Sequence, residues 1–84
     1  MTNKEILIKK IIYRSKHRGT KEMDLLLGNF VKKYINGLNE NELKDLESLI
    51  SIRDEIIHKW YFENELTGDV PNTKISSMLK NFKI

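Results

Sequence analysis

The side chains best suited to chemistry in this sequence lie close together, in the stretch KHRGTKEMD at positions 16–24. It holds an imidazole, a guanidinium and two carboxylates, from His17, Arg18, Glu22 and Asp24. Such groups can transfer protons, but acid–base catalysis also needs a concave site that restricts water. The same groups can instead form hydrogen bonds and ion pairs with a partner, whose backbone can approach Gly19 closely because glycine has no side chain.

The rest of the chain argues against catalysis. The sequence contains no glycine-rich phosphate loop and no nucleophile with a base at hand, and its two histidines, His17 and His58, lie far apart. It has no cysteine, which excludes disulfides and thiolate zinc sites. A chain of 84 residues in short helices also leaves little room for an enclosed site. We therefore predict that the protein is not an enzyme.

Apolar residues recur at helical spacing on both sides of this stretch. In the segment after it, Met23, Leu26, Leu27, Phe30, Val31 and Tyr34 form a wide apolar stripe. The pattern predicts helices over residues 1–17, 23–34, 39–50, 52–62 and 75–82, with a capping box from Asn39 and Glu42 at the start of the third. Strand alternation is not seen. The expected fold is all-α: one domain, residues 1–84, forming a small five-helix bundle.

Four positions carry more specific expectations. Gly19 and Gly37 stand at helix ends, where glycine most easily adopts a left-handed backbone. Gly28 stands inside a helix, where glycine costs about 1 kcal/mol relative to alanine. We favour a close helix–helix approach there over a neutral substitution. Trp60 is expected in the core.

Helix-end electrostatics offer a second explanation of the charged stretch. Glu22 and Asp24 belong to the first turn of the following helix, where carboxylates interact favourably with the helix dipole. Lys16, His17 and Arg18 lie near the end of the preceding helix, where cations are favoured. The residues alone leave this interpretation open beside the docking one.

The pattern R-G-x-x-E-x-D at residues 18–24 resembles the signature of the small succinate dehydrogenase assembly factors, the flavinylation factors of bacteria and mitochondria. A second pattern, L-x-x-x-D-x-x-[LI]-x-x-W, is matched by Ile50, Asp54, Ile57 and Trp60, with isoleucine in the leucine position. The resemblance covers roughly residues 4–80. The chain departs from the family at His17, where many members have a second arginine.

The resemblance implies a binding chaperone. Such proteins dock on the flavoprotein subunit of succinate dehydrogenase, and in bacteria also on that of fumarate reductase, and they promote covalent attachment of FAD to a histidine of that subunit. The client's own groups form the bond, so we expect no stable cofactor on this chain. The expected partner-binding residues are His17, Arg18, Gly19, Lys21, Glu22 and Asp24. Arg18 is expected to be exposed, whereas Asp24 either contacts the client or stabilises its own helix, and we favour the second role.

Charge and hydropathy define the remaining alternatives. The net charge of +3 and the pairs Lys9–Lys10 and Lys32–Lys33 would also suit a small nucleic-acid-binding or antitoxin-like module. The signs are mixed along the chain, so we expect no nucleic-acid partner. No apolar run reaches the roughly 20 residues that span a bilayer, so we expect no membrane insertion. The basic N-terminal segment contains Glu5 and is interpreted as a helix of the domain and not as a removable leader. Because we expect no leader and no membrane span, and because the expected client faces the cytoplasm, we predict a bacterial cytoplasmic protein.

Overall fold

The computed structural model describes residues 2–83 and contains, within them, five α-helices, one short 3-10 helix and no strand. The elements are α1 (Asn3–Lys16), α2 (Lys21–Tyr34), η1 (Ile35–Gly37), α3 (Glu40–Ile50), α4 (Asp54–Phe62) and α5 (Lys74–Asn81). The predicted all-α fold with five helices is confirmed. The predicted boundaries agree with the structure to within a few residues.

Helix α2 forms the centre of the core, as its apolar stripe predicts. Met23, Leu26, Leu27 and Phe30 are fully buried, and Val31 is nearly so. Thr20 caps the helix by accepting a hydrogen bond from the backbone N–H of Met23. The cap satisfies one of the amides that have no partner at a helix N-terminus. It also fixes the point at which the charged loop becomes helix.

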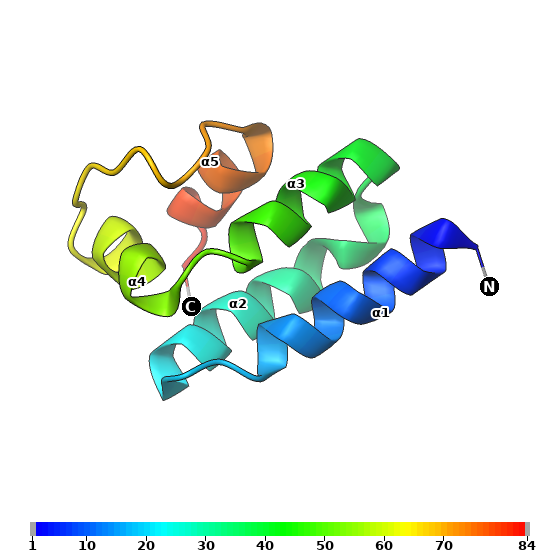
Figure 1. The fold of residues 1–84 in the computed structure, drawn as a ribbon, viewed down its shortest axis with the longest axis horizontal. Helices are drawn as coiled ribbons and strands as arrows, with labels where there is room; N and C mark the ends of the chain where they lie inside the picture. The colour runs from blue at the N-terminus through cyan, green and yellow to red at the C-terminus, as the bar shows by residue number, and fades with distance from the viewer. Residues whose placement is uncertain (1, 84) are drawn as a thin grey trace.

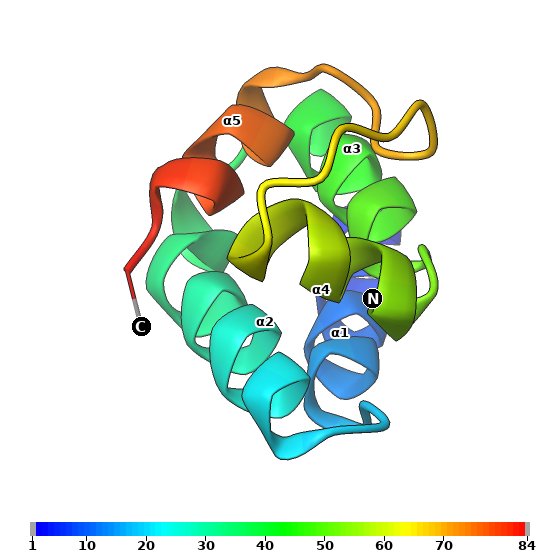
Figure 2. The ribbon, with the colours of Figure 1, turned by 90° about the vertical axis from the view of Figure 1, so that its left-hand side faces the viewer.

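The first three α-helices run back and forth along the long axis of the molecule (Figure 1). Helix α1 packs on α2 and α3, and α5 packs on α3. Helix α4 lies at the end of the molecule where α1 is joined to α2, as both views show (Figures 1 and 2). Residues 63–73 then cross the outside of the molecule to reach α5. This arrangement brings the α1–α2 loop next to the α3–α4 junction.

Trp60 belongs to the edge of the core, not to its interior. Its side chain is half-buried and packs against the buried cluster. The ammonium group of Lys80 lies 4.8 Å from the centroid of its ring. The prediction that Trp60 is a core residue is therefore only partly confirmed, because one side of the ring is covered by a lysine side chain and not by apolar residues.

The expectation of left-handed glycines at the helix ends is wrong. Among the described residues no glycine has a positive φ, and Asn64 alone among the others does, at 55°. Helix α1 ends instead at His17, whose φ is −114° and whose ring Nδ1 lies 2.8 Å from the carbonyl oxygen of Tyr13. Since a carbonyl only accepts, Nδ1 is the protonated nitrogen in this contact. A side chain thus caps this helix, and no left-handed residue is needed.

Gly28 does not mark the tight helix–helix contact that we expected. A β-carbon at this position would lie 3.8 Å from the backbone oxygen of Ser15 on α1, an ordinary van der Waals distance. Gly28→Ala should therefore raise the free energy of unfolding by about 0.5–1 kcal/mol, because alanine loses less backbone entropy in a helix. Urea denaturation followed by circular dichroism measures the difference. A loss of stability would show that the two helices approach more closely than this geometry allows.

The capping box at the start of α3 is confirmed, and it predicts a pH effect. Glu42 accepts from the backbone N–H of Asn39 at 2.9 Å and from Lys74 at 3.0 Å. The Asn39 amide, and then the Lys74 ammonium, lower the pKa of Glu42 from its ordinary value of 4.5. A lowered folded-state pKa stabilises the protein above the unfolded-state value, and this stabilisation is lost as the pH falls through the folded-state pKa.

Glu42→Gln should therefore be less stable than wild type at pH 7, and the difference should shrink as the pH falls below 4.5. Urea titrations at a series of pH values measure it. A difference that stays constant from pH 7 down to pH 3 would contradict this assignment. Glu40→Gln in the same first turn is the matched control, because the other capping-box contacts remain.

Candidate functional site

The α1–α2 loop, residues 17–20, is held against the first residue of α4. Asp54 accepts a hydrogen bond from Arg18 Nε at 2.8 Å through one carboxylate oxygen, and from the backbone N–H of Gly19 at 2.7 Å through the other. Arg18 Nη2 also forms an ion pair with Asp54. Asp54 opens α4, where the helix dipole favours a negative charge. Two segments more than 30 residues apart in the sequence are thereby fixed to each other.

The guanidinium group of Arg18 is buried within the protein, so the expectation that it is exposed is wrong. Its side chain is only 10% exposed. Besides Asp54, it donates to the carbonyl oxygens of Ile50 at 2.6 Å, Ile52 at 3.2 Å and Arg14 at 3.3 Å. The carbonyls at the end of a helix have no intrahelical partner, and the planar donor fork of arginine suits several acceptors at once. Arg18 therefore positions the loop, and its donors are already occupied.

Asp24 makes its contact within the protein, but with the preceding loop and not with its own helix as we favoured. Its carboxylate, half-buried in the first turn of α2, accepts from the backbone N–H of Arg18 at 2.8 Å. Arg18 is thus held through its side chain by Asp54 and through its backbone by Asp24. We call this set of three residues, Arg18, Asp24 and Asp54, the clasp.

Four of the predicted partner-binding residues lie on the outside of the clasp. His17, Gly19, Lys21 and Glu22 are all exposed. The ring of His17 stacks on that of Tyr13, with the centroids 4.2 Å apart, and Tyr13 is itself 64% exposed. The structure therefore divides the predicted set into two residues that position the loop, Arg18 and Asp24, and four exposed residues that can contact a partner.

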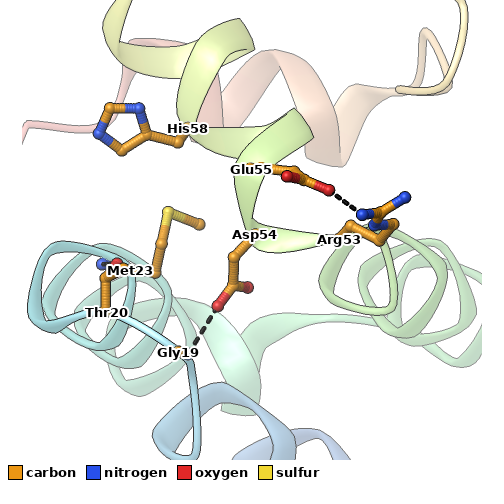
Figure 3. A pocket seen from close by; sticks show the side chains of 7 residues that line it. All are labelled: Gly19, Thr20, Met23, Arg53, Asp54, Glu55 and His58. Atoms are coloured by element: carbon orange, nitrogen blue, oxygen red, sulfur yellow. Dashed lines mark hydrogen bonds and ion pairs between the residues drawn. The ribbon is translucent and has the colours of Figure 1, made fainter.

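A cleft of about 480 Å³ opens beside Gly19, between the start of α2 and α4 (Figure 3). Met23 lies on the α2 side of the cleft and His58 on the α4 side. It is lined by Gly19, Thr20, Met23, Arg53, Asp54, Glu55 and His58. A β-carbon on Gly19 would lie 3.3 Å from Asp54 Oδ2, a tight contact. Glycine therefore lets the loop approach the carboxylate of Asp54. It also places no side chain on this edge of the cleft.

Sequence analysis did not assign a role to Asp54, Arg53, Glu55 or His58. The second sequence pattern includes Asp54 and could have marked it as a functional residue. That pattern does not indicate which residue Asp54 contacts. Arg53 and Glu55 form an ion pair on the rim of the cleft (Figure 3). His58 Nδ1 lies 3.4 Å from a carboxylate oxygen of Glu63 and pairs with it when the imidazole is protonated.

Residues 2–83 contain neither a cluster suited to a metal ion nor a helix suited to a bilayer. No group of three histidine, aspartate or glutamate side chains in this part of the chain could hold a metal ion. None of the described helices is both long enough and apolar enough to cross a bilayer.

Comparisons with known proteins agree with the sequence motif. The family model described as flavinator of succinate dehydrogenase matches residues 9–83. The chain is 38% identical over 77 residues to succinate dehydrogenase assembly factor 2, mitochondrial, of Saccharomyces cerevisiae, covering 87% of this chain and 48% of that protein. The protein of the same name in Arabidopsis thaliana is 40% identical over 63 residues, covering 75% and 34% respectively.

The protein of that name in Danio rerio is 34% identical over 80 residues, which are 93% of this chain and 51% of that protein. The chain thus spans about half the length, or less, of these relatives. The family match nevertheless covers nearly all of the present sequence, including the clasp, the exposed loop and the cleft. The chain belongs to the family of flavinators of succinate dehydrogenase.

Proposed function

We propose that this chain is an assembly factor that binds the flavoprotein subunit of succinate dehydrogenase and promotes covalent attachment of FAD to it. Family membership supports this function, and the names of the relatives describe succinate dehydrogenase assembly. The structural observation that carries the proposal is the clasp, which fixes the Arg-Gly loop in one arrangement before any partner binds. Preorganisation of this kind lowers the entropic cost of binding.

The exposed side of the loop is the proposed contact surface. Gly19 lets a client backbone approach, while Glu22 and Lys21 offer a carboxylate and an ammonium group, with His17 at the edge. Arg18 and Asp24 contribute by holding this surface in place. In this proposal the chain is not an enzyme and holds no FAD of its own, because the client's groups form the covalent bond.

The broader sequence predictions stay part of the proposal. The flavoprotein subunit of fumarate reductase is a second candidate client. The location predicted from the sequence is the bacterial cytoplasm, whereas the three relatives named above are mitochondrial proteins by name. Nucleic acid is not favoured as a partner, since the family match points to protein assembly. The antitoxin-like alternative has no similar support.

The experiment is a covalent-flavin assay. The flavoprotein subunit is expressed in a host without its own assembly factor, with and without this chain, and separated on a denaturing gel. Flavin fluorescence should remain on the subunit only when the chain is present. Equal fluorescence in both samples would contradict the proposed function. The same assay with the fumarate reductase subunit tests the second client.

A further inference from the structure

A groove on a different part of the molecule remains without a role. It lies between α1 and α2 and continues to η1, with a volume of about 490 Å³. Ile12 on α1, Val31 on α2 and Ile35 in η1 give it apolar walls. Val31 and Ile35 are almost completely buried, so they form a floor and not a rim. None of these residues belongs to the clasp or to the cleft beside Gly19.

Gly28 keeps this groove open. It lines the groove in the middle of α2, and a β-carbon there would meet only the backbone oxygen of Ser15, at 3.8 Å. Glycine is therefore not required by the packing of α1 against α2. A glycine in a helix interior lowers stability by about 1 kcal/mol relative to alanine, so the fold itself does not explain why glycine stands here. A bulky apolar side chain from a partner fits the space above it.

The charge around the groove is positive. Residues 1–37 carry nine lysines and arginines against three acidic residues, whereas residues 38–84 carry six against nine. Lys16 from α1 and Lys32 from α2 line the groove, and among residues 2–83 neither has an ion pair. By contrast, Lys10 and Lys74 pair with Glu47 and Glu42. The two groove lysines are thus available to a negatively charged partner.

We propose that the α1–α2 groove binds an acidic segment of the client flavoprotein subunit, with an apolar side chain above Gly28 and carboxylates paired with Lys16 and Lys32. The proposal rests on the proposed function. Lys16 stands two residues before Arg18, so a client docked on the exposed loop extends naturally over the near end of the groove. Opposite charges at this second contact speed association and fix the orientation of the complex.

The chemistry of the groove favours a peptide over a nucleic acid. Binding of single-stranded nucleic acid relies on aromatic side chains for base stacking, and no aromatic residue lines this groove. Its apolar lining residues are aliphatic, its neutral polar ones are Ser15, Asn29 and Asn36, and its only charged ones are two lysines. An acidic peptide with one large apolar residue matches both features.

The test is titration calorimetry of the purified chain with the purified flavoprotein subunit. Lys16→Glu/Lys32→Glu should weaken binding by at least about tenfold, because like charges then face the acidic segment. Gly28→Leu should do the same by filling the groove, whereas Gly28→Ala should change the affinity by less than about threefold. Lys44→Glu/Lys59→Glu, which reverses two exposed lysines outside the groove, is the matched control and should also bind within about threefold of wild type.

Melting curves establish that each variant is folded, and the lysine pair keeps the test valid if Gly28→Leu does not fold. Groove variants that bind the subunit like wild type, while Gly19→Arg does not, would overturn this inference and leave the proposed function intact. A wild-type chain that does not bind the subunit would overturn both. Tight binding of a single-stranded DNA oligonucleotide that is lost in the lysine variants, with client affinity unchanged, would assign the groove to nucleic acid and overturn the inference.

Discussion

Arg18→Ala is expected to lower the free energy of unfolding by about 3 kcal/mol, a large part of the 5–15 kcal/mol typical of a whole domain. The substitution leaves the carboxylate of Asp54, itself only 23% exposed, without its cation. It also leaves the carbonyl oxygens of Ile50 and Ile52 without their donor. Breaking a buried ion pair from one side is costly because the remaining charge is uncompensated.

Urea denaturation followed by circular dichroism measures this loss. Arg14→Ala is the matched control, because Arg14 is an exposed arginine on α1, four residues before Arg18, with a single side-chain partner, Ser51 Oγ at 3.0 Å. Its loss should be below about 1 kcal/mol. Arg18→Met combined with Asp54→Leu should recover part of the stability, since both charges are then removed together. An Arg18→Ala protein within 0.5 kcal/mol of wild type would show that the clasp does not hold the loop in solution.

The second large effect is expected on function and not on stability. Gly19→Arg should cost the fold about 1 kcal/mol or less, because φ at Gly19 is not positive and only the 3.3 Å contact with Asp54 Oδ2 must relax. Binding of the flavoprotein subunit should weaken by about 30-fold or more, roughly 2 kcal/mol, since a long side chain then stands between the two surfaces. Covalent flavin on the co-expressed subunit should fall toward the level seen without the chain.

Melting curves, calorimetry and gel fluorescence on the same preparations separate the two effects. Gly37→Arg is the matched control: it adds the same side chain at an exposed glycine where a β-carbon would meet nothing within 4 Å. It should change neither stability nor flavinylation appreciably. A folded Gly19→Arg chain that supports wild-type flavinylation would remove the loop from the docking surface and favour the alternative in which its charges only stabilise helix ends.

The sequence by itself determined the helices and the family. The stripe from Met23 to Tyr34 and the Asn39–Glu42 capping box depend on contacts three or four residues apart, which the order of residues specifies directly. The motif at residues 18–24 by itself indicates the flavinator family, and the family match confirms it. It also located the loop that the structure fixes between α1 and α2.

Only the tertiary structure decided what each charged residue faces. The sequence motif contains the same arginine whether its side chain points to solvent or into the protein. Arg18 points inward because α4 places Asp54, 36 positions away in the sequence, against the loop. The same packing of the loop against the α3–α4 junction makes the cleft with Met23 and His58. Gly28 likewise borders an open groove and not a tight contact, because the distance between α1 and α2 is set by all the side chains between them and not by the glycine alone.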